Sequence, residues 1–235
     1  MIWAGVGVAA LLRAFTGFGF ALAAVPVFSM FMVPADVVVL TASLSLVMGL
    51  ISVRAWWGVH DSREILPLVL LAWMGTALGA FLLTAMSAAH FQLLAGLTVL
   101  SACLVIILSR PAAPLRNRPL TLSAGLLSGL MNGALAMPGP PMIVYALLTE
   151  FDPLRSRALL LMFFTVSSLL ALCSYAVAGL VGWQSLQVAL VALPALYPGD
   201  WLGNRLFLKY GGVFYRRVAV LALALMGIAV IVRAL

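Results

Sequence analysis

Charged residues are scarce in this sequence, and their scarcity excludes a soluble protein. Only 8% of the 235 residues are charged, against 65% that are hydrophobic, whereas a typical soluble domain has about 25% charged residues. A soluble protein of this composition could not cover its surface with polar atoms. The longest polar connection, residues 109–119, is too short to fold as a separate domain.

Cysteine and histidine are also rare, and the few present do not form a metal-binding pattern. Cys103 and Cys173 lie inside apolar runs without a partner at metal-ligand spacing. His60 and His90 fall in loops. We therefore expect no metal ion and no other cofactor, and we expect both thiols to be buried and unreactive.

Motifs for catalysis and for nucleotide binding are missing as well. The chain contains neither G-x-S-x-G nor H-E-x-x-H, and Gly17-x-Gly19 lacks both the third glycine and the preceding strand of a nucleotide-binding fold. The net charge of +7 comes from basic residues that stand singly or in pairs between apolar runs. This distribution is typical of membrane topology signals, so we expect no nucleic-acid partner.

Long apolar runs are what the sequence has in abundance. A helix needs about 20 apolar residues to cross a bilayer. In lipid, a helix is the structure in which a single segment pairs its own backbone N–H and C=O groups. The sequence therefore predicts an all-α polytopic protein of the cell inner membrane, whose main partner is the lipid bilayer. Its six longest runs are Val37–Ala55, Ile65–Met86, Phe91–Leu108, Ala158–Val181, Leu186–Leu208 and Val218–Leu235.

An internal repeat divides the chain. The segment Ala10–Gly19, which leads to Pro26, resembles Gly125–Ala134, which leads to Pro141. Repeats of this kind are typical of transporter folds. We predict two repeats, each a broken helical hairpin followed by three spans. The boundaries are residues 1–110 for the first repeat (hairpin 2–32), 111–119 for a cytoplasmic linker, and 120–235 for the second repeat (hairpin 120–149).

The basic residues predict how these segments cross. If all eight segments crossed once, Lys and Arg would divide six against six between the two sides, with Arg13 inside the membrane. If both hairpins instead return to the side they entered from, eleven basic residues share one side and only Arg233 lies on the other. Cytoplasmic loops are enriched in Lys and Arg. We therefore predict re-entrant hairpins, inverted repeats and both termini on the outer side, although two complete crossings per hairpin give the same parity.

The hairpins are expected to break at glycine and proline. Pro138-Gly139-Pro140-Pro141 removes three backbone donors, Asn132-Gly133 weakens the preceding arm, and Gly17 and Gly19 make the first hairpin flexible. The helix that follows each break begins with unpaired N–H groups, which attract anions. Two inverted hairpins would bring two such helix starts together and form a site for a small anion. Close helix packing is the alternative role for these residues.

At this point the sequence resembles a known family. Thr16-Gly17-Phe18-Gly19 with Pro26, the Gly-Pro-rich stretch of the second half, and Gly199–Arg205 are similar to the TauE/SafE sulfite exporter family over nearly the whole chain. The resemblance implies transport of small anions such as sulfite and organosulfonates. The proline cluster after Asn132-Gly133 departs from the glycine-rich pattern common in the second repeat of that family.

Candidate site residues follow from the breaks and from polar groups at membrane depth. Arg13 is charged within the membrane and is either functional or directed to an interface. Asp200 is expected to carry a coupling proton, with a structural pair to Arg205 as the alternative. Thr16, Asn132 and Tyr145 either bind the substrate or hold helices together. The expected substrate-binding residues are Arg13, Thr16, Gly17, Gly19, Asn132, Gly133, Pro138, Gly139 and Tyr145.

The sequence thus predicts a secondary transporter, not an enzyme, that exports a small anion by alternating access with ion or proton coupling. A passive anion channel is the nearest alternative, and an intramembrane enzyme is a more distant one. The chain could also form a homodimer.

Overall fold

The computed structural model describes residues 2–234 except 17–18, 109–116, 151 and 211–212, and this part of the chain is helical without a strand. The all-α prediction is therefore confirmed. The helices are α1 (Ile2–Thr16), α2 (Phe20–Ser29), α3 (Pro34–Ile51), α4 (Ser62–Thr84), α5 (Ala88–Leu108), α6 (Arg118–Leu135), α7 (Gly139–Thr149), α8 (Pro153–Val177), α9 (Trp183–Ala192), α10 (Leu196–Tyr210) and α11 (Val213–Ala234), with 3-10 turns η1 (Val53–Ala55) and η2 (Leu193–Ala195).

The surface of this bundle is suited to lipid. The described residues include four helices long and apolar enough to cross a membrane, namely α3, α4, α5 and α8. Large apolar side chains such as Phe81, Ile107 and Leu225 are about two-thirds exposed, at 70%, 65% and 67%. In water such a surface would drive association, whereas in a bilayer it faces hydrocarbon. The protein is therefore a multi-pass membrane protein.

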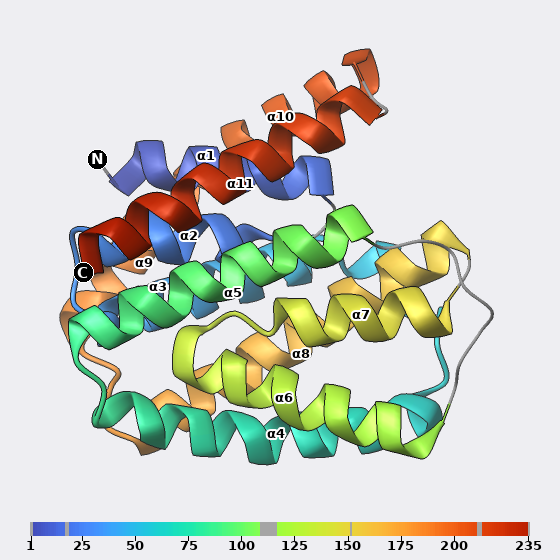
Figure 1. Ribbon diagram of the computed structural model, residues 1–235, viewed down its shortest axis with the longest axis horizontal. Coiled ribbons are helices and arrows are strands. Elements are labelled where there is room, and N and C mark those ends of the chain that lie inside the picture. The colour runs from blue at the N-terminus through green and yellow to red at the C-terminus, as the bar shows by residue number, and fades with distance from the viewer. Residues whose placement is uncertain (1, 17–18, 109–116, 151, 211–212, 235) are drawn as a thin grey trace.

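The structure contains two helical hairpins that enter the bundle from opposite ends (Figure 1). Helices α1 and α2 form a hairpin that begins at the end where both termini lie. Helix α6 begins at the opposite end of the bundle, and helix α7 returns to that same end, near the start of α8. Each hairpin therefore turns back inside the molecule. The predicted linker 111–119 lies mostly outside the described residues, and its last two residues already belong to α6.

The predicted span Leu186–Leu208 is not one straight helix. It is divided into α9 and α10 by the 3-10 turn η2, which contains Pro194. Proline lacks the N–H group that would continue the helical ladder and crowds the preceding turn. The break therefore comes at Pro194.

Small residues let the hairpins pack closely against other helices. Helix α6 runs along α4, and α1 runs along α10. A Cβ atom added to Gly125 would lie 2.7 Å from the Leu68 carbonyl oxygen, and one added to Gly199 would lie 2.6 Å from the Gly7 carbonyl oxygen. Without a hydrophobic driving force between helices, association in lipid depends on such close van der Waals contact.

The thiols were predicted only in part. Cys103 is buried, and its Sγ lies 3.7 Å from the carbonyl oxygen of Val220 on α11. Cys173 is exposed on the surface of α8, so the expectation that it would be buried is wrong. In a membrane protein an apolar sequence context marks a lipid-facing residue as readily as a buried one.

Candidate functional site

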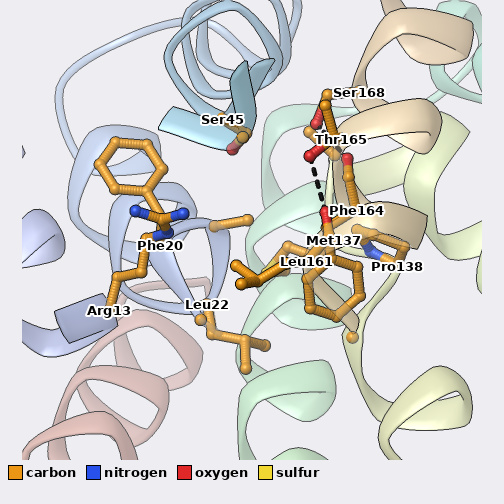
Figure 2. Close-up of a pocket in the computed structure, with 15 residues that line it drawn as sticks. Arg13, Phe20, Leu22, Ser45, Met137, Pro138, Leu161, Phe164, Thr165 and Ser168 are labelled. Carbon is orange, nitrogen blue, oxygen red and sulfur yellow. Dashed lines mark hydrogen bonds between the residues drawn. The ribbon is translucent and has the colours of Figure 1, made fainter. Parts of the chain in front are cut away.

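A cavity of about 50 Å³ lies where the two hairpins break, several times the ~10–15 Å³ that a single water requires. Figure 2 shows Arg13, Phe20 and Leu22 on one side of it, with Met137, Pro138 and Phe164 opposite. The elements that line it are α1, α3, α8 and the segments around the starts of α2 and α7. Of the predicted site residues, Arg13, Gly19, Pro138 and Gly139 line this cavity.

The first break presents backbone donors to the cavity. Gly19 has φ 110, a conformation that favours glycine, and it precedes α2 without a side-chain cap. The next three residues, Phe20, Ala21 and Leu22, line the cavity. The first N–H groups of a helix have no intrahelical acceptor, and the helix dipole adds partial positive charge there. The start of α2 therefore favours an anion.

The second break has a different character. Helix α6 ends at Ala136, which has φ 54 and donates its N–H to the Asn132 carbonyl oxygen at 2.7 Å. Helix α7 then starts at Gly139 with Pro140 and Pro141 in its first turn. Since proline has no N–H, this helix start offers fewer donors than α2 does. The two helix starts at the cavity therefore differ, and α2 offers more backbone donors than α7.

Arg13 supplies a full positive charge at the cavity. It lies in the last turn of α1, and its side chain is 13% exposed. Its Nη2 donates to the Met48 carbonyl oxygen at 3.4 Å and to Ser52 Oγ at 3.2 Å, both near the end of α3. Its Nη1 lies 3.6 Å from Asp200 Oδ1 on α10. The guanidinium group is therefore held by a helix C-terminus, which carries partial negative charge, and by a carboxylate.

Hydroxyl groups line the side of the cavity formed by α3 and α8. They belong to Ser45, Thr165 and Ser168, none of which was predicted from the sequence. Thr165 Oγ1 donates to the Leu161 carbonyl oxygen at 2.6 Å, and Ser168 Oγ donates to the Phe164 carbonyl oxygen at 2.7 Å. A serine or threonine inside an apolar helix usually bonds its own backbone in this way, so no feature of the sequence indicates that these three residues face a cavity.

Asn132 and Gly133 lie in α6 but do not line the cavity. Asn132 is 2% exposed, and its Nδ2 donates to the Ser167 carbonyl oxygen at 2.8 Å and to Thr76 Oγ1 at 3.3 Å. Gly133 packs against the backbone of α4 at Thr76. These two residues join helices, which was the alternative considered for them, and they do not break the arm as expected.

Tyr145 lies at a second, larger cavity of about 640 Å³, which is also lined by His60, Asn117 and Arg118. Its hydroxyl oxygen lies 3.4 Å from Thr121 Oγ1. Tyr145 is therefore not at the hairpin breaks. Gly17 lies outside the described residues. Thr16 is the last residue of α1, and its side chain is not among those described.

Asp200 is placed in α10 with its side chain 36% exposed, close to Arg13. The sequence did not predict this contact between the two repeats. Arg205, the partner considered for Asp200, has its guanidinium carbon 5.0 Å from the centre of the Trp201 ring. Among the described residues, no group of three or more His, Cys, Asp or Glu side chains could hold a metal ion.

Comparison with known protein families shows which family the chain resembles. The family described as sulfite exporter TauE/SafE matches residues 2–230, which covers both hairpins and nearly all of the chain. No match was found among curated proteins or among solved structures.

Proposed function

The chain belongs to the TauE/SafE family of membrane sulfite and anion exporters, and on that basis we propose that it is a secondary transporter that exports sulfite or an organosulfonate. The observation that carries the proposal is the cavity at the hairpin breaks, with Arg13 and the start of α2 on its wall. A sulfite or sulfonate group has three oxygens. It can therefore accept hydrogen bonds from a guanidinium group and from several backbone N–H groups at once.

Alternating access is the mechanism we propose. Substrate sites of transporters with inverted repeats lie where discontinuous helices meet, and one repeat moves against the other around them. Here the hairpins enter from opposite ends and their breaks share one cavity. Helix α4 of the first proposed repeat packs against α6 of the second, and α10 of the second packs against α1 of the first. Because α1 corresponds to α6 and α4 to α10, these two matching contacts support an inverted repeat.

The driving force we propose is electrochemical, because the sequence has no phosphate-binding loop for ATP. An interior-negative potential of 100 mV drives each negative charge out of the cell and contributes about 2.3 kcal/mol per charge. Export of an anion is therefore favourable without ATP. Asp200 remains the residue we propose as the carrier of a coupled proton, since it is an acid 3.6 Å from Arg13, and Arg13 lines the cavity.

Counterflow in proteoliposomes tests the proposal. Vesicles loaded with unlabelled sulfite should accumulate labelled sulfite transiently from outside, because a carrier exchanges bound substrate across the membrane. A passive channel gives only equilibration, so absence of the transient would favour a channel. Running the same assay with methanesulfonate, sulfate and acetate identifies the preferred head group, and lack of transport of every anion in the panel would contradict the proposed function.

A further inference from the structure

Arg13 connects α1 to α3 and α10 through polar contacts, of which the ion pair with Asp200 is the longest. Its nitrogen atoms lie 3.6 Å from Asp200 Oδ1 on α10, and 3.4 Å and 3.2 Å from the Met48 carbonyl oxygen and Ser52 Oγ on α3. A tight hydrogen bond between a guanidinium group and a carboxylate measures about 2.7–2.9 Å. The ion pair with Asp200 is therefore loose, although Arg13 itself is largely buried.

Polar contacts that hold helices together elsewhere in the molecule cover a range of distances. Asn132 Nδ2 donates to the Ser167 carbonyl oxygen at 2.8 Å and to Thr76 Oγ1 at 3.3 Å, and Tyr175 Oη donates to the Asn132 carbonyl oxygen at 2.8 Å. Distance alone therefore does not set Arg13 apart from these structural contacts. Arg13 instead combines a buried charge, a loose carboxylate partner and a position on the cavity wall.

We propose that the transported anion and the Asp200 carboxylate compete for the Arg13 guanidinium. This inference rests on the proposed function and specifies how its site is regulated. A sulfonate entering the cavity brings a second negative group towards a cation that already faces one. Its binding must weaken the contact between Arg13 and Asp200, and with it a link between α1 and α10. The carboxylate thus opposes substrate binding until it is neutralised or moved.

Competition of this kind couples proton binding to anion binding with a definite sign. Protonation removes the negative charge of Asp200, so Arg13 is released and anion affinity rises as the pH falls. By linkage, anion binding must favour protonation of Asp200 to the same extent. The described charged group that acts on Arg13 besides Asp200 is Arg157 on α8. Arg205, about one and a half turns further along α10, lies over Trp201.

The sign of this coupling between proton binding and anion binding decides the direction in which the proton travels. A proton and an anion that bind cooperatively travel in the same direction, whereas a proton that excludes the anion would travel in the opposite one. The Arg13–Asp200 contact therefore indicates cotransport of the anion with a proton. With one proton per cycle, a dianion such as sulfite still leaves with one net negative charge and is driven by the membrane potential, whereas a monovalent sulfonate leaves with none and is driven by its own concentration gradient.

The test measures binding of methanesulfonate to purified, monodisperse protein by calorimetry across a range of pH. Methanesulfonate is chosen because its head group does not titrate near neutral pH, whereas sulfite does. At neutral pH, Asp200→Asn should bind it more tightly, by roughly fivefold for an ion pair that is partly exposed. Lowering the pH should raise the affinity of the wild type until the two curves meet, while the affinity of Asp200→Asn stays constant.

Two controls separate this effect from a general change of charge. Asp36→Asn removes an acid that contacts Ser185 at the starts of α3 and α9, and Arg205→Gln removes a cation from the same helix as Asp200. Neither residue lines the cavity, and neither is among the described charged groups that act on Arg13, so both variants should keep the wild-type pH dependence. Equal affinity and equal pH dependence of Asp200→Asn and the wild type would overturn the competition while leaving the proposed function intact.

A second measurement needs no variant. In weakly buffered, mildly acidic solution, binding of methanesulfonate to the wild type should take up protons, which a pH indicator detects. Anion binding without proton uptake overturns the inference alone, even if Asp200→Asn fails to fold. If the wild type binds neither sulfite nor any sulfonate, the proposed function itself is contradicted.

Discussion

Gly133 of α6 lies directly against the backbone carbonyl of Thr76 on α4, and a Cβ atom at this position would overlap that carbonyl. Gly133 was predicted to be part of the substrate site, and this contact indicates a role in helix packing instead. It lets two helices approach at backbone distance, which in lipid replaces the hydrophobic effect as the source of association. Variants at Gly133 should therefore change stability and not anion affinity.

Gly133→Ala should destabilise the protein by roughly 1–3 kcal/mol, the usual cost of overpacking, because rigid backbone of α4 must move to admit the methyl group. A lower melting temperature of the detergent-purified protein checks this. Gly7→Ala is the matched control, since no atom lies within 4 Å of the added Cβ; it should keep or raise the melting temperature. An unchanged melting temperature for Gly133→Ala would show that α4 and α6 are not closely packed.

Gly139→Leu should abolish anion binding without preventing folding. A Cβ at Gly139 meets the Leu22 Cδ1 atom at an ordinary 3.6 Å, so a short side chain fits, but a leucine extends into a cavity of about 50 Å³. Gly139→Ala serves as the control and should retain most of the affinity. Gly17→Leu is the parallel variant in the first hairpin. Normal binding by both leucine variants would place the substrate elsewhere.

Arg13→Met should weaken anion binding by roughly 1.5–3 kcal/mol, the value of a hydrogen bond to a charged group. Arg13→Lys should recover part of the loss, because it keeps the charge but not the planar fork of donors. The measurement is the Kd of methanesulfonate, with Arg205→Met as the matched loss of a cation outside the cavity. If Arg13→Met and Arg205→Met bind equally well, Arg13 is a structural residue.

Asn132→Ala should lower stability by roughly 0.6–1.7 kcal/mol, the range measured for hydrogen bonds between membrane helices, and leave the Kd unchanged. The variant removes the donor to Ser167 and Thr76. Tyr175→Phe, which removes a hydrogen bond to the Asn132 carbonyl oxygen, should have a similar effect on stability. A large loss of anion affinity in Asn132→Ala would show that Asn132 contributes to the substrate site.

Single-cysteine labelling should find Asn117 and Ser156 on the same side of the membrane and Gln184 on the other. Asn117 and Ser156 lie at the starts of α6 and α8, and Gln184 lies at the start of α9. Both native cysteines must be replaced first, since Cys173 is exposed. Labelling of Asn117 and Ser156 from opposite sides would exclude re-entrant hairpins, and cytoplasmic access to both would support the predicted outer position of the termini.

The fold was largely predictable because each segment carries its own signal. A run such as Phe91–Leu108 is helical in lipid whatever surrounds it, and α5 ends at Leu108 as predicted. The breaks at Gly19 and Pro138 were also local, since they depend on backbone conformations and missing donors within a few residues. Pro194 carried the same kind of signal, and the break there could have been predicted in place of an uninterrupted span.

The candidate site was predictable only where its residues coincide with the breaks. Gly19, Pro138 and Gly139 line the cavity for that reason. Ser45 and Thr165, in contrast, look like any hydroxyl residue in an apolar helix. Which face of α3 or α8 meets a cavity depends on how that helix is rotated against its neighbours, and in an all-apolar segment no polar stripe reveals the rotation.

The sequence by itself determined that this protein is a membrane bundle of helices with two interrupted hairpins, because hydrophobic length and broken backbone are local properties of the chain. The tertiary structure alone decided which polar groups meet. It brought Arg13 to Asp200, 187 positions apart in the numbering (200 minus 13), and it assigned Asn132 and Gly133 to helix packing. Charge pairing and close packing both act over a few ångströms in space, and separation along the chain carries no information about that distance.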